Sequence, residues 1–186
     1  MIPIISIVGK KNSGKTTLIE KIIPELKKRG YRVGVIKHDV HQFEIDYPGK
    51  DTYRIRQAGA DIVAIVSDKK IAMIRTTNNE LQTTCLDEIA LWLFPDVDII
   101  ITEGYKRLNK PKIEITRSGE LLCTKDDNLL AVVFNELQTT NYEIRTTTNK
   151  LQITNLNVSC FSIDEVSALT DFVIEKVIKT GSVNQK

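Results

Sequence analysis

The sequence has little of what marks disulfide-stabilised, zinc-binding or membrane-spanning proteins. Its 186 residues include only three cysteines, Cys85, Cys123 and Cys160, which lie far apart and without C-x-x-C spacing. This spacing argues against a disulfide framework or a zinc site, so we expect three small buried thiols in a reducing compartment. No apolar run approaches the roughly 20 residues of a membrane helix. We therefore expect a cytoplasmic protein without a membrane partner, in which the apolar opening forms the first strand.

An excess of charge of one sign is also missing. The formal net charge is +2, so the composition gives no reason to expect a nucleic-acid partner. Hydrophobic residues make up 41% and charged residues 27% of the chain, which is typical of a globular protein. At this length we expect a single domain over residues 1–186, with a Thr/Asn-rich insert at about 135–154.

The most informative stretch that is present is a glycine-bounded loop between a strand pattern and a helix pattern. An apolar run ends at Gly9, and a helix with apolar residues on one side follows from about residue 15 to residue 29. The loop between them has the G-x-x-x-x-G-K-T spacing of a phosphate-binding P-loop. Its residues are Gly9, Lys10, Lys11, Asn12, Ser13, Gly14, Lys15 and Thr16.

This loop has the chemistry that a magnesium-bound triphosphate requires. Main-chain N–H groups in a tight glycine loop form an anion-binding nest, and the helix N-terminus that follows also favours anions. Lys15 is expected to reach the β- and γ-phosphates, and the Thr16 hydroxyl is expected to ligate Mg²⁺. The sequence therefore predicts a nucleoside-triphosphate site at the start of the first helix.

The order of patterns along the chain predicts an α/β fold. A strand, the loop, a helix and a second strand at 31–37 imply a right-handed crossover and a parallel sheet covered on both faces. Further strands are expected at 97–102, 129–134 and 156–161, and helices at about 84–94 and 163–179. Hairpins are expected from strands 61–67 and 69–75, and over 112–124, where one face needs cover. The predicted class is a three-layer P-loop NTPase fold with a largely parallel, mixed central sheet and a β-hairpin extension at about 111–125.

Acidic residues at the carboxyl edge of this sheet are candidates for holding the metal and the attacking water. Asp39 follows the second strand, and a Mg²⁺ or water-positioning role and a turn or cap role are equally compatible with its place. Asp98 lies at the start of the strand at 97–102 and Glu103 at its exit, about 15 Å apart, and only Glu103 stands at the phosphate end. Gly104 is expected to let a main-chain N–H face the γ-phosphate.

Two weaker features occur in polar loops. His38 and His41 together suggest a metal pair, but without a third ligand nearby we prefer to interpret them as polar loop residues. Residues 124–127 match the [NT]-K-x-D pattern by which many GTPases bind guanine, although a turn between strands is the preferred interpretation of so short a match.

With these pieces in place, the chain resembles the MobB family, the small P-loop GTP-binding proteins of molybdopterin–guanine dinucleotide synthesis. The likeness rests on residues 7–60, which include KHD-x-H and PGKD-x-Y-R, and on residues 98–106, 111–115 and 129–134. The stretch after this last strand departs from the family pattern. Where an acid is expected at the end of the strand, Phe134 and Asn135 stand instead.

The resemblance implies a ligand, a metal and partners. MobB proteins bind GTP with Mg²⁺, hydrolyse it weakly and assist the guanylyltransferase that joins GMP to molybdopterin. They are homodimers in which a β-hairpin extends into the partner. Carried over by position, the phosphate loop includes Thr17, the Mg²⁺ neighbourhood is Thr16, Asp39 and Glu103, and the catalytic residues are Lys15, Asp39 and Glu103.

Two other functions compete with this one. A small-molecule kinase uses the same loop but needs an arginine-bearing lid, for which Arg54 and Arg56 are the candidates near the site. A pure interaction protein with a degenerate loop is the third possibility, and the intact Lys15 and Thr16 argue against it.

Overall fold

The computed structural model describes residues 1–38, 43–77, 86–123, 127–135, 144–147, 150–153 and 158–180. Asp39, His41 and the first three residues of the 124–127 pattern lie outside these ranges. The chain divides into two compact units, Met1–His38 with Ala90–Lys186, and Asp39–Ile89.

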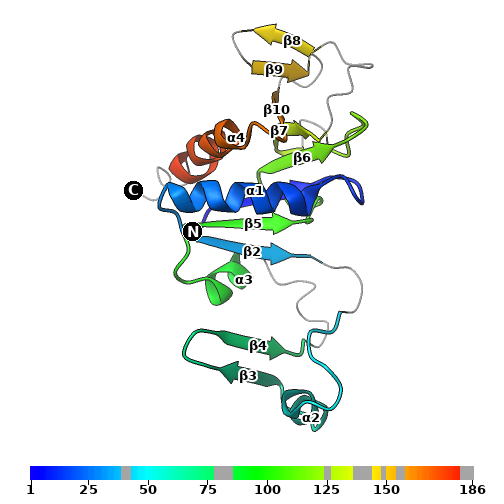
Figure 1. Ribbon diagram of the computed structural model, residues 1–186, viewed down its shortest axis with the longest axis vertical. Coiled ribbons are helices and arrows are strands. Elements are labelled where there is room, and N and C mark those ends of the chain that lie inside the picture. Colours follow the sequence, from blue (N-terminus) through cyan, green and yellow to red (C-terminus); the bar gives the residue numbers. More distant parts are fainter. Residues whose placement is uncertain are drawn as a thin grey trace. The chain divides into compact units, whose positions relative to one another are not determined.

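The larger unit is built on an eight-stranded sheet in which six neighbouring strands are parallel (Figure 1). The parallel strands lie in the order β2 (Val33–Lys37), β5 (Ile99–Glu103), β1 (Ile4–Val8), β6 (Lys112–Thr116), β7 (Leu129–Phe134) and β10 (Val158–Ser162). The sheet ends with β9 (Lys150–Ile153) and β8 (Ile144–Thr147), which pair antiparallel. The 135–154 insert therefore contributes an antiparallel hairpin to the edge of the sheet, and the sheet is mixed as predicted.

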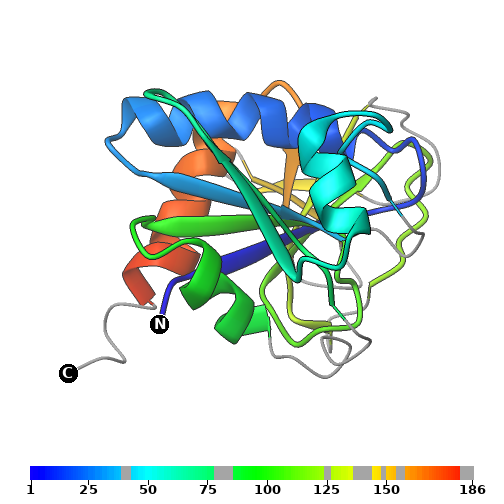
Figure 2. The same cartoon turned by 90° about the horizontal axis from the view of Figure 1, so that it is seen from below.

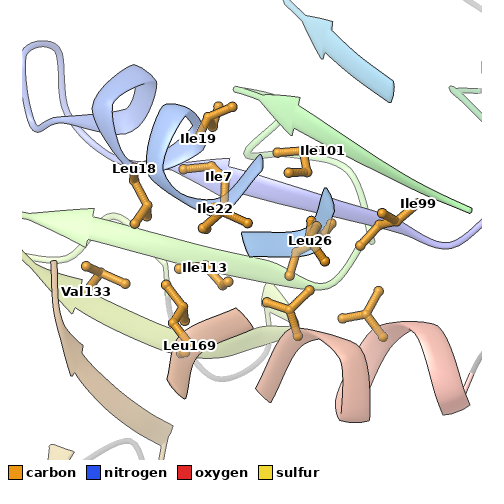
Figure 3. Close-up of a cluster of buried hydrophobic side chains, with 14 of the residues drawn as sticks. Ile7, Leu18, Ile19, Ile22, Leu26, Ile99, Ile101, Ile113, Val133 and Leu169 are labelled. Atoms are coloured by element: carbon orange, nitrogen blue, oxygen red, sulfur yellow. The ribbon is translucent and has the colours of Figure 1, made fainter. Parts of the chain in front are cut away.

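Helices cover both faces of this sheet. On one face lie α1 (Lys15–Lys28) and α4 (Val166–Val173), which continues as the π-helical η3 (Ile174–Lys179). Apolar residues from these helices meet alternate strand residues such as Ile7, Ile101 and Ile113 in the main core (Figure 3). The end of α3 (Leu86–Leu93) lies on the opposite face (Figure 2). The ring of Phe94, which follows α3, covers Gly34 on β2. The strand–loop–helix–strand order predicted for the first 37 residues is confirmed.

The smaller unit contains α2 (Asp51–Gln57) and a hairpin of β3 (Ile62–Val66) and β4 (Ile71–Arg75). The two strands pair antiparallel with Ile62 opposite Arg75 and Val66 opposite Ile71. The predicted hairpin at 61–75 is confirmed, and it forms a two-stranded sheet of its own.

The hairpin predicted at 112–124 is wrong. Residues 112–116 form β6, which lies between β1 and β7 and is parallel to both, and all five of its side chains are buried. The face expected to need cover is covered within the sheet, and the polar side chains of this strand are satisfied internally. The buried Lys112 ammonium donates to three loop carbonyls, and the buried Glu114 carboxylate accepts the N–H groups of Leu122 (2.6 Å) and Cys123 (2.9 Å).

Candidate functional site

The predicted phosphate loop, residues 9–16, joins β1 to α1 through two glycines in conformations that other residues rarely adopt. Gly9 has φ +149° and Gly14, the N-cap of α1, has φ +105°. A Cβ on Gly9 would lie 2.3 Å from the carbonyl oxygen of Ile115, which belongs to the backbone of the central strand β6. The loop therefore packs so closely on the sheet that only glycine fits at its start.

The two side chains expected to handle phosphate and metal lie at this loop. The Lys15 ammonium donates to the carbonyls of Gly9 (3.2 Å) and Lys10 (2.9 Å), so it lies over the beginning of the loop. The Thr16 hydroxyl donates to Oε2 of Glu103 at 3.0 Å. The structure thus brings together three of the predicted site residues, Lys15, Thr16 and Glu103.

The register of the sheet explains why Glu103, and not Asp98, reaches the loop. Glu103 ends β5 and stands opposite Ile7 of β1, just before the loop begins. Asp98 precedes β5 at the other edge, where its carboxylate accepts the Arg32 N–H at 2.6 Å and lies 3.5 Å from the Arg32 guanidinium. These two contacts hold the pKa of the Asp98 carboxyl below its usual value. Asp98 is therefore a structural residue at the amino edge.

The interior of the phosphate loop contains a buried hydroxyl group that is suited to bind a ligand. Ser13 is buried, and its hydroxyl oxygen has no hydrogen-bond partner within the described part of the chain. Its N–H closes a turn onto the Lys10 carbonyl at 3.2 Å. A buried hydroxyl beside two glycines, at the mouth of a helix, fits an anion that supplies acceptor oxygens. Lys11, Asn12 and Thr17 are exposed.

The N–H of Gly104 itself is not the main-chain N–H expected to face the γ-phosphate. It donates to the Ile7 carbonyl at 3.0 Å, so the sheet already uses it. Gly104 instead allows the chain to turn sharply after β5, with φ +102° followed by φ +57° at Tyr105. The turn places the Tyr105 ring 4.6 Å from the ring of His38, which follows β2, and burial raises the pKa of the Tyr105 hydroxyl.

Two residues that sequence reasoning missed complete this side of the site. The Glu120 carboxylate forms an ion pair with the Lys10 ammonium. The Asn135 side-chain amide donates to the Ser13 carbonyl at 3.1 Å, while its own N–H donates to the Thr116 carbonyl at 3.0 Å. Glu120 follows β6 and Asn135 follows β7, the next two strands beyond β1 in the sheet. Treating β6 as a parallel strand would have predicted them, since the carboxyl ends of parallel strands share one edge.

The remaining candidates contribute less. Glu103 is one carboxylate beside one hydroxyl, and the described residues contain no group of three or more His, Cys, Asp or Glu side chains arranged to hold a metal. Mg²⁺ needs fewer protein ligands than that, since it keeps several waters and binds nucleotide phosphates as well. Arg54 and Arg56, the candidate lid arginines of a kinase, each have a carboxylate partner, Asp51 and Glu44. Within the described ranges no helix is long and apolar enough to cross a membrane.

Comparison with known proteins places this geometry in a family. The family described as "Molybdopterin guanine dinucleotide synthesis protein B", MobB, matches residues 4–135, which include every element of the site described above. The chain belongs to the MobB family. The match ends at Asn135, where the Thr/Asn-rich insert begins.

Relatives of this MobB family member extend the similarity over nearly the whole chain. It is 32% identical over 181 residues to the "Molybdopterin-guanine dinucleotide biosynthesis adapter protein" of Escherichia coli strain K12, covering 94% of this chain and 93% of that protein. It is 38% identical over 137 residues to the protein of the same name from Haemophilus influenzae, covering 72% and 75% of the two chains. A crystal structure of "molybdopterin-guanine biosynthesis protein B (mobB)" superposes with a TM-score of 0.65 at 30% identity and covers 92% of this chain and 98% of that one. The predicted P-loop NTPase-like α/β class is confirmed.

Proposed function

We propose that this protein is a GTP-binding adapter of molybdenum cofactor biosynthesis that assists the guanylyltransferase joining GMP to molybdopterin and hydrolyses GTP slowly with Mg²⁺. The observation that carries the proposal is the contact of Thr16 with Glu103 at the loop over which the Lys15 ammonium lies. The names of the similar adapter proteins support the pathway.

The residues present fit a magnesium-bound triphosphate. The Thr16 hydroxyl and the Glu103 carboxylate would hold Mg²⁺, with Asp39 as a further candidate from outside the described residues. Bound Mg²⁺ would neutralise charge between the β- and γ-phosphates. Lys15 exchanges its two carbonyl acceptors for phosphate oxygens, which are stronger partners because they are charged. Glu103 accepts the hydrogen bond of the Thr16 hydroxyl through one oxygen and keeps its second oxygen for orienting a water.

Nucleotide binding and its base preference are tested together by a competition titration. Displacement of a fluorescent GTP analogue by GTP and by ATP, each with Mg²⁺, measures both affinities, and we expect GTP to bind more tightly. Lys15→Ala is expected to abolish binding while the far-ultraviolet circular dichroism spectrum stays unchanged. Lys27→Ala, an exposed lysine near the other end of α1, is the matched control and should bind normally. Unchanged GTP affinity in Lys15→Ala would disprove the site.

Hydrolysis distinguishes the two acids at the ends of β5. Glu103→Gln removes a charge beside Thr16, whereas Asp98→Asn removes one at the opposite edge of the sheet. We expect Glu103→Gln to slow Mg²⁺-dependent phosphate release from GTP about tenfold or more and Asp98→Asn to change it less than twofold. The reverse order would show that Glu103 is the wrong acid.

The proposal includes a homodimer, for which the β3–β4 hairpin is the extension in place of residues 112–124. Val63 is buried in this hairpin, but Ile65, Val66 and Ile71 are 60%, 68% and 76% exposed. A two-stranded hairpin is at best marginally stable alone in water, so these side chains favour cover by a second copy of the chain. Light scattering after gel filtration should give a dimer for the native chain and a monomer for Ile65→Lys. A dimer that survives this substitution would exclude the hairpin as the interface.

A further inference from the structure

The phosphate loop carries a second ammonium group that the proposed function does not yet use. Lys10 is the second residue of the loop, and its carbonyl is one of the two that hold the Lys15 ammonium (2.9 Å). The Lys10 side chain therefore starts beside the group expected to bind the β- and γ-phosphates. In this structure its ammonium is paired with the Glu120 carboxylate, which belongs to the segment after β6.

The segment that presents Glu120 is held in place by its own hydrogen bonds. The Thr116 hydroxyl, at the end of β6, accepts the N–H of Gly119 at 3.1 Å and donates to the carbonyl of Glu120 at 3.1 Å. Two residues further on, the N–H of Leu122 donates to the buried Glu114 carboxylate at 2.6 Å. Glu120 is thus fixed between two anchors on the same buried strand, so its carboxylate reaches the loop from a defined backbone position.

The pair itself is weak enough to exchange. The side chains of Lys10 and Glu120 are 49% and 69% exposed, and an ion pair with so much solvent exposure contributes little to stability. The Lys10 ammonium holds the pKa of the Glu120 carboxyl below its usual value, so the carboxylate is charged at neutral pH. A bound triphosphate concentrates several negative charges at the loop and is a stronger partner for an ammonium than one exposed carboxylate.

We propose that Lys10 is a second phosphate-binding cation beside Lys15, and that Glu120 holds it off the phosphates until a nucleoside triphosphate displaces the carboxylate. Glu120 then sets the nucleotide affinity in two ways, since it occupies Lys10 and places a negative charge near the phosphates. The effect is larger for a triphosphate than for a diphosphate, because the extra phosphate adds charge at the end of the ligand where the Lys15 ammonium lies. This inference rests on the nucleotide site of the proposed function.

The test is a set of affinities for GTP and GDP, each with Mg²⁺, measured by isothermal titration calorimetry. We expect Glu120→Gln to tighten GTP binding about threefold and Lys10→Gln to weaken it about fivefold, with smaller changes for GDP. In the Lys10→Gln background, Glu120→Gln should give a clearly smaller gain than in the native chain, because no ammonium remains to be released. All differences should shrink at high salt, because both charges are exposed.

Two controls match the charge changes. Glu175→Gln and Lys27→Gln alter exposed residues outside the loop and should leave both affinities unchanged. The thermal unfolding midpoint of each loop variant without nucleotide should stay within a few degrees of the native value, which separates a binding effect from a folding effect.

The variants test the roles of Glu120 and Lys10 separately. Unchanged or weaker GTP binding by Glu120→Gln would overturn the proposed role of Glu120, and unchanged binding by Lys10→Gln would overturn that of Lys10. If Glu120→Gln lowers the affinity for GTP but not the affinity for ATP in the competition titration, the carboxylate contacts the base, which also refutes the proposal. If the native chain binds neither nucleotide, the proposed function fails and the role of Lys10 fails with it.

Discussion

Lys112 joins two loops at the start of β6, and replacing it by methionine tests how the sheet tolerates a buried charge. Its side chain is 1% exposed, and its ammonium donates to the carbonyls of Leu108 (2.6 Å), Lys110 (3.2 Å) and Asp127 (2.5 Å). Each carbonyl belongs to a segment outside the strands. The ammonium therefore ties the connection before β6 to the one before β7.

The expected loss follows from what methionine keeps and what it lacks. Methionine fills a similar volume along the aliphatic stem but has no donor for the three carbonyls. Hydrogen bonds from a charged donor contribute about 1.5–3 kcal/mol each, so three amount to about 5 kcal/mol or more. Relief from burying the ammonium offsets part of this loss, and water reaches carbonyls in part-exposed loops. We expect Lys112→Met to lower the free energy of unfolding by about 2–4 kcal/mol.

Urea unfolding, followed by circular dichroism, measures this difference. Lys27→Met, at an exposed position of α1, is the control and should stay within about 0.5 kcal/mol of the native chain. A loss below 1 kcal/mol for Lys112→Met would refute the reasoning, because it would mean that the three carbonyls gain as much from water as from the ammonium.

Two further predictions concern Gly9 at the start of the phosphate loop and the buried thiol of Cys123. Gly9→Ala should lower the free energy of unfolding by about 3 kcal/mol or more and abolish nucleotide binding, because its Cβ would meet the Ile115 carbonyl oxygen at 2.3 Å. The control Gly30→Ala, with φ +87° but open space around it, should lower it by only about 1 kcal/mol. Similar losses for the two variants in urea unfolding would contradict this prediction. Burial and Glu114 raise the pKa of the Cys123 thiol from 9.0 to about 12. Because the unfolded thiol ionises first, the contribution of the Cys123 thiol to stability is complete below pH 9 and falls by about 1.4 kcal/mol per pH unit from there toward pH 12. Cys123→Ala should therefore lose stability less steeply than the native chain above pH 9. Parallel curves of unfolding free energy against pH for the two proteins would refute this prediction.

The elements predicted correctly are those in which a strong hydrophobic periodicity coincides with local signals such as glycines. β1, the loop and α1 are confirmed because an apolar run, two glycines and a helical stripe all indicate the same structure. Glu103 was placed correctly because the rise of a strand decides which end of β5 meets the loop. These inferences need no knowledge of which strands are neighbours.

The wrong predictions are those that depend on the neighbours of a strand. Alternation of Ile113 and Ile115 with polar residues looks the same in a half-exposed strand and in one whose polar side is buried against internal partners. The sequence does not show which main-chain N–H at Gly104 is left for a phosphate, because the register of β1 and β5 gives the N–H of Gly104 itself to the Ile7 carbonyl. Glu120 and Asn135 were missed for the same reason, since their approach to the loop follows from strand order.

Strand order also decides the [NT]-K-x-D match at 124–127. Its aspartate, Asp127, lies two residues before the first residue of β7, Leu129, and the Lys112 ammonium at the start of β6 holds its carbonyl. Since β7 runs parallel to β6, and β6 to β1, the start of β7 lies at the amino edge of the sheet. At about 3.3 Å per residue, the six residues of β7 separate Asp127 by roughly 20 Å from the edge where the phosphate loop lies.

A guanine base bound at that loop is therefore out of reach of the Asp127 carboxylate. Asp127→Asn should leave the ratio of GTP to ATP affinity unchanged within twofold, and it should also spare the fold, because the carbonyl that Lys112 holds is retained. The same competition titration that tests Lys15→Ala measures the ratio. A tenfold fall in preference for GTP would require Asp127 to lie near the carboxyl edge, and the strand order described above would then be wrong.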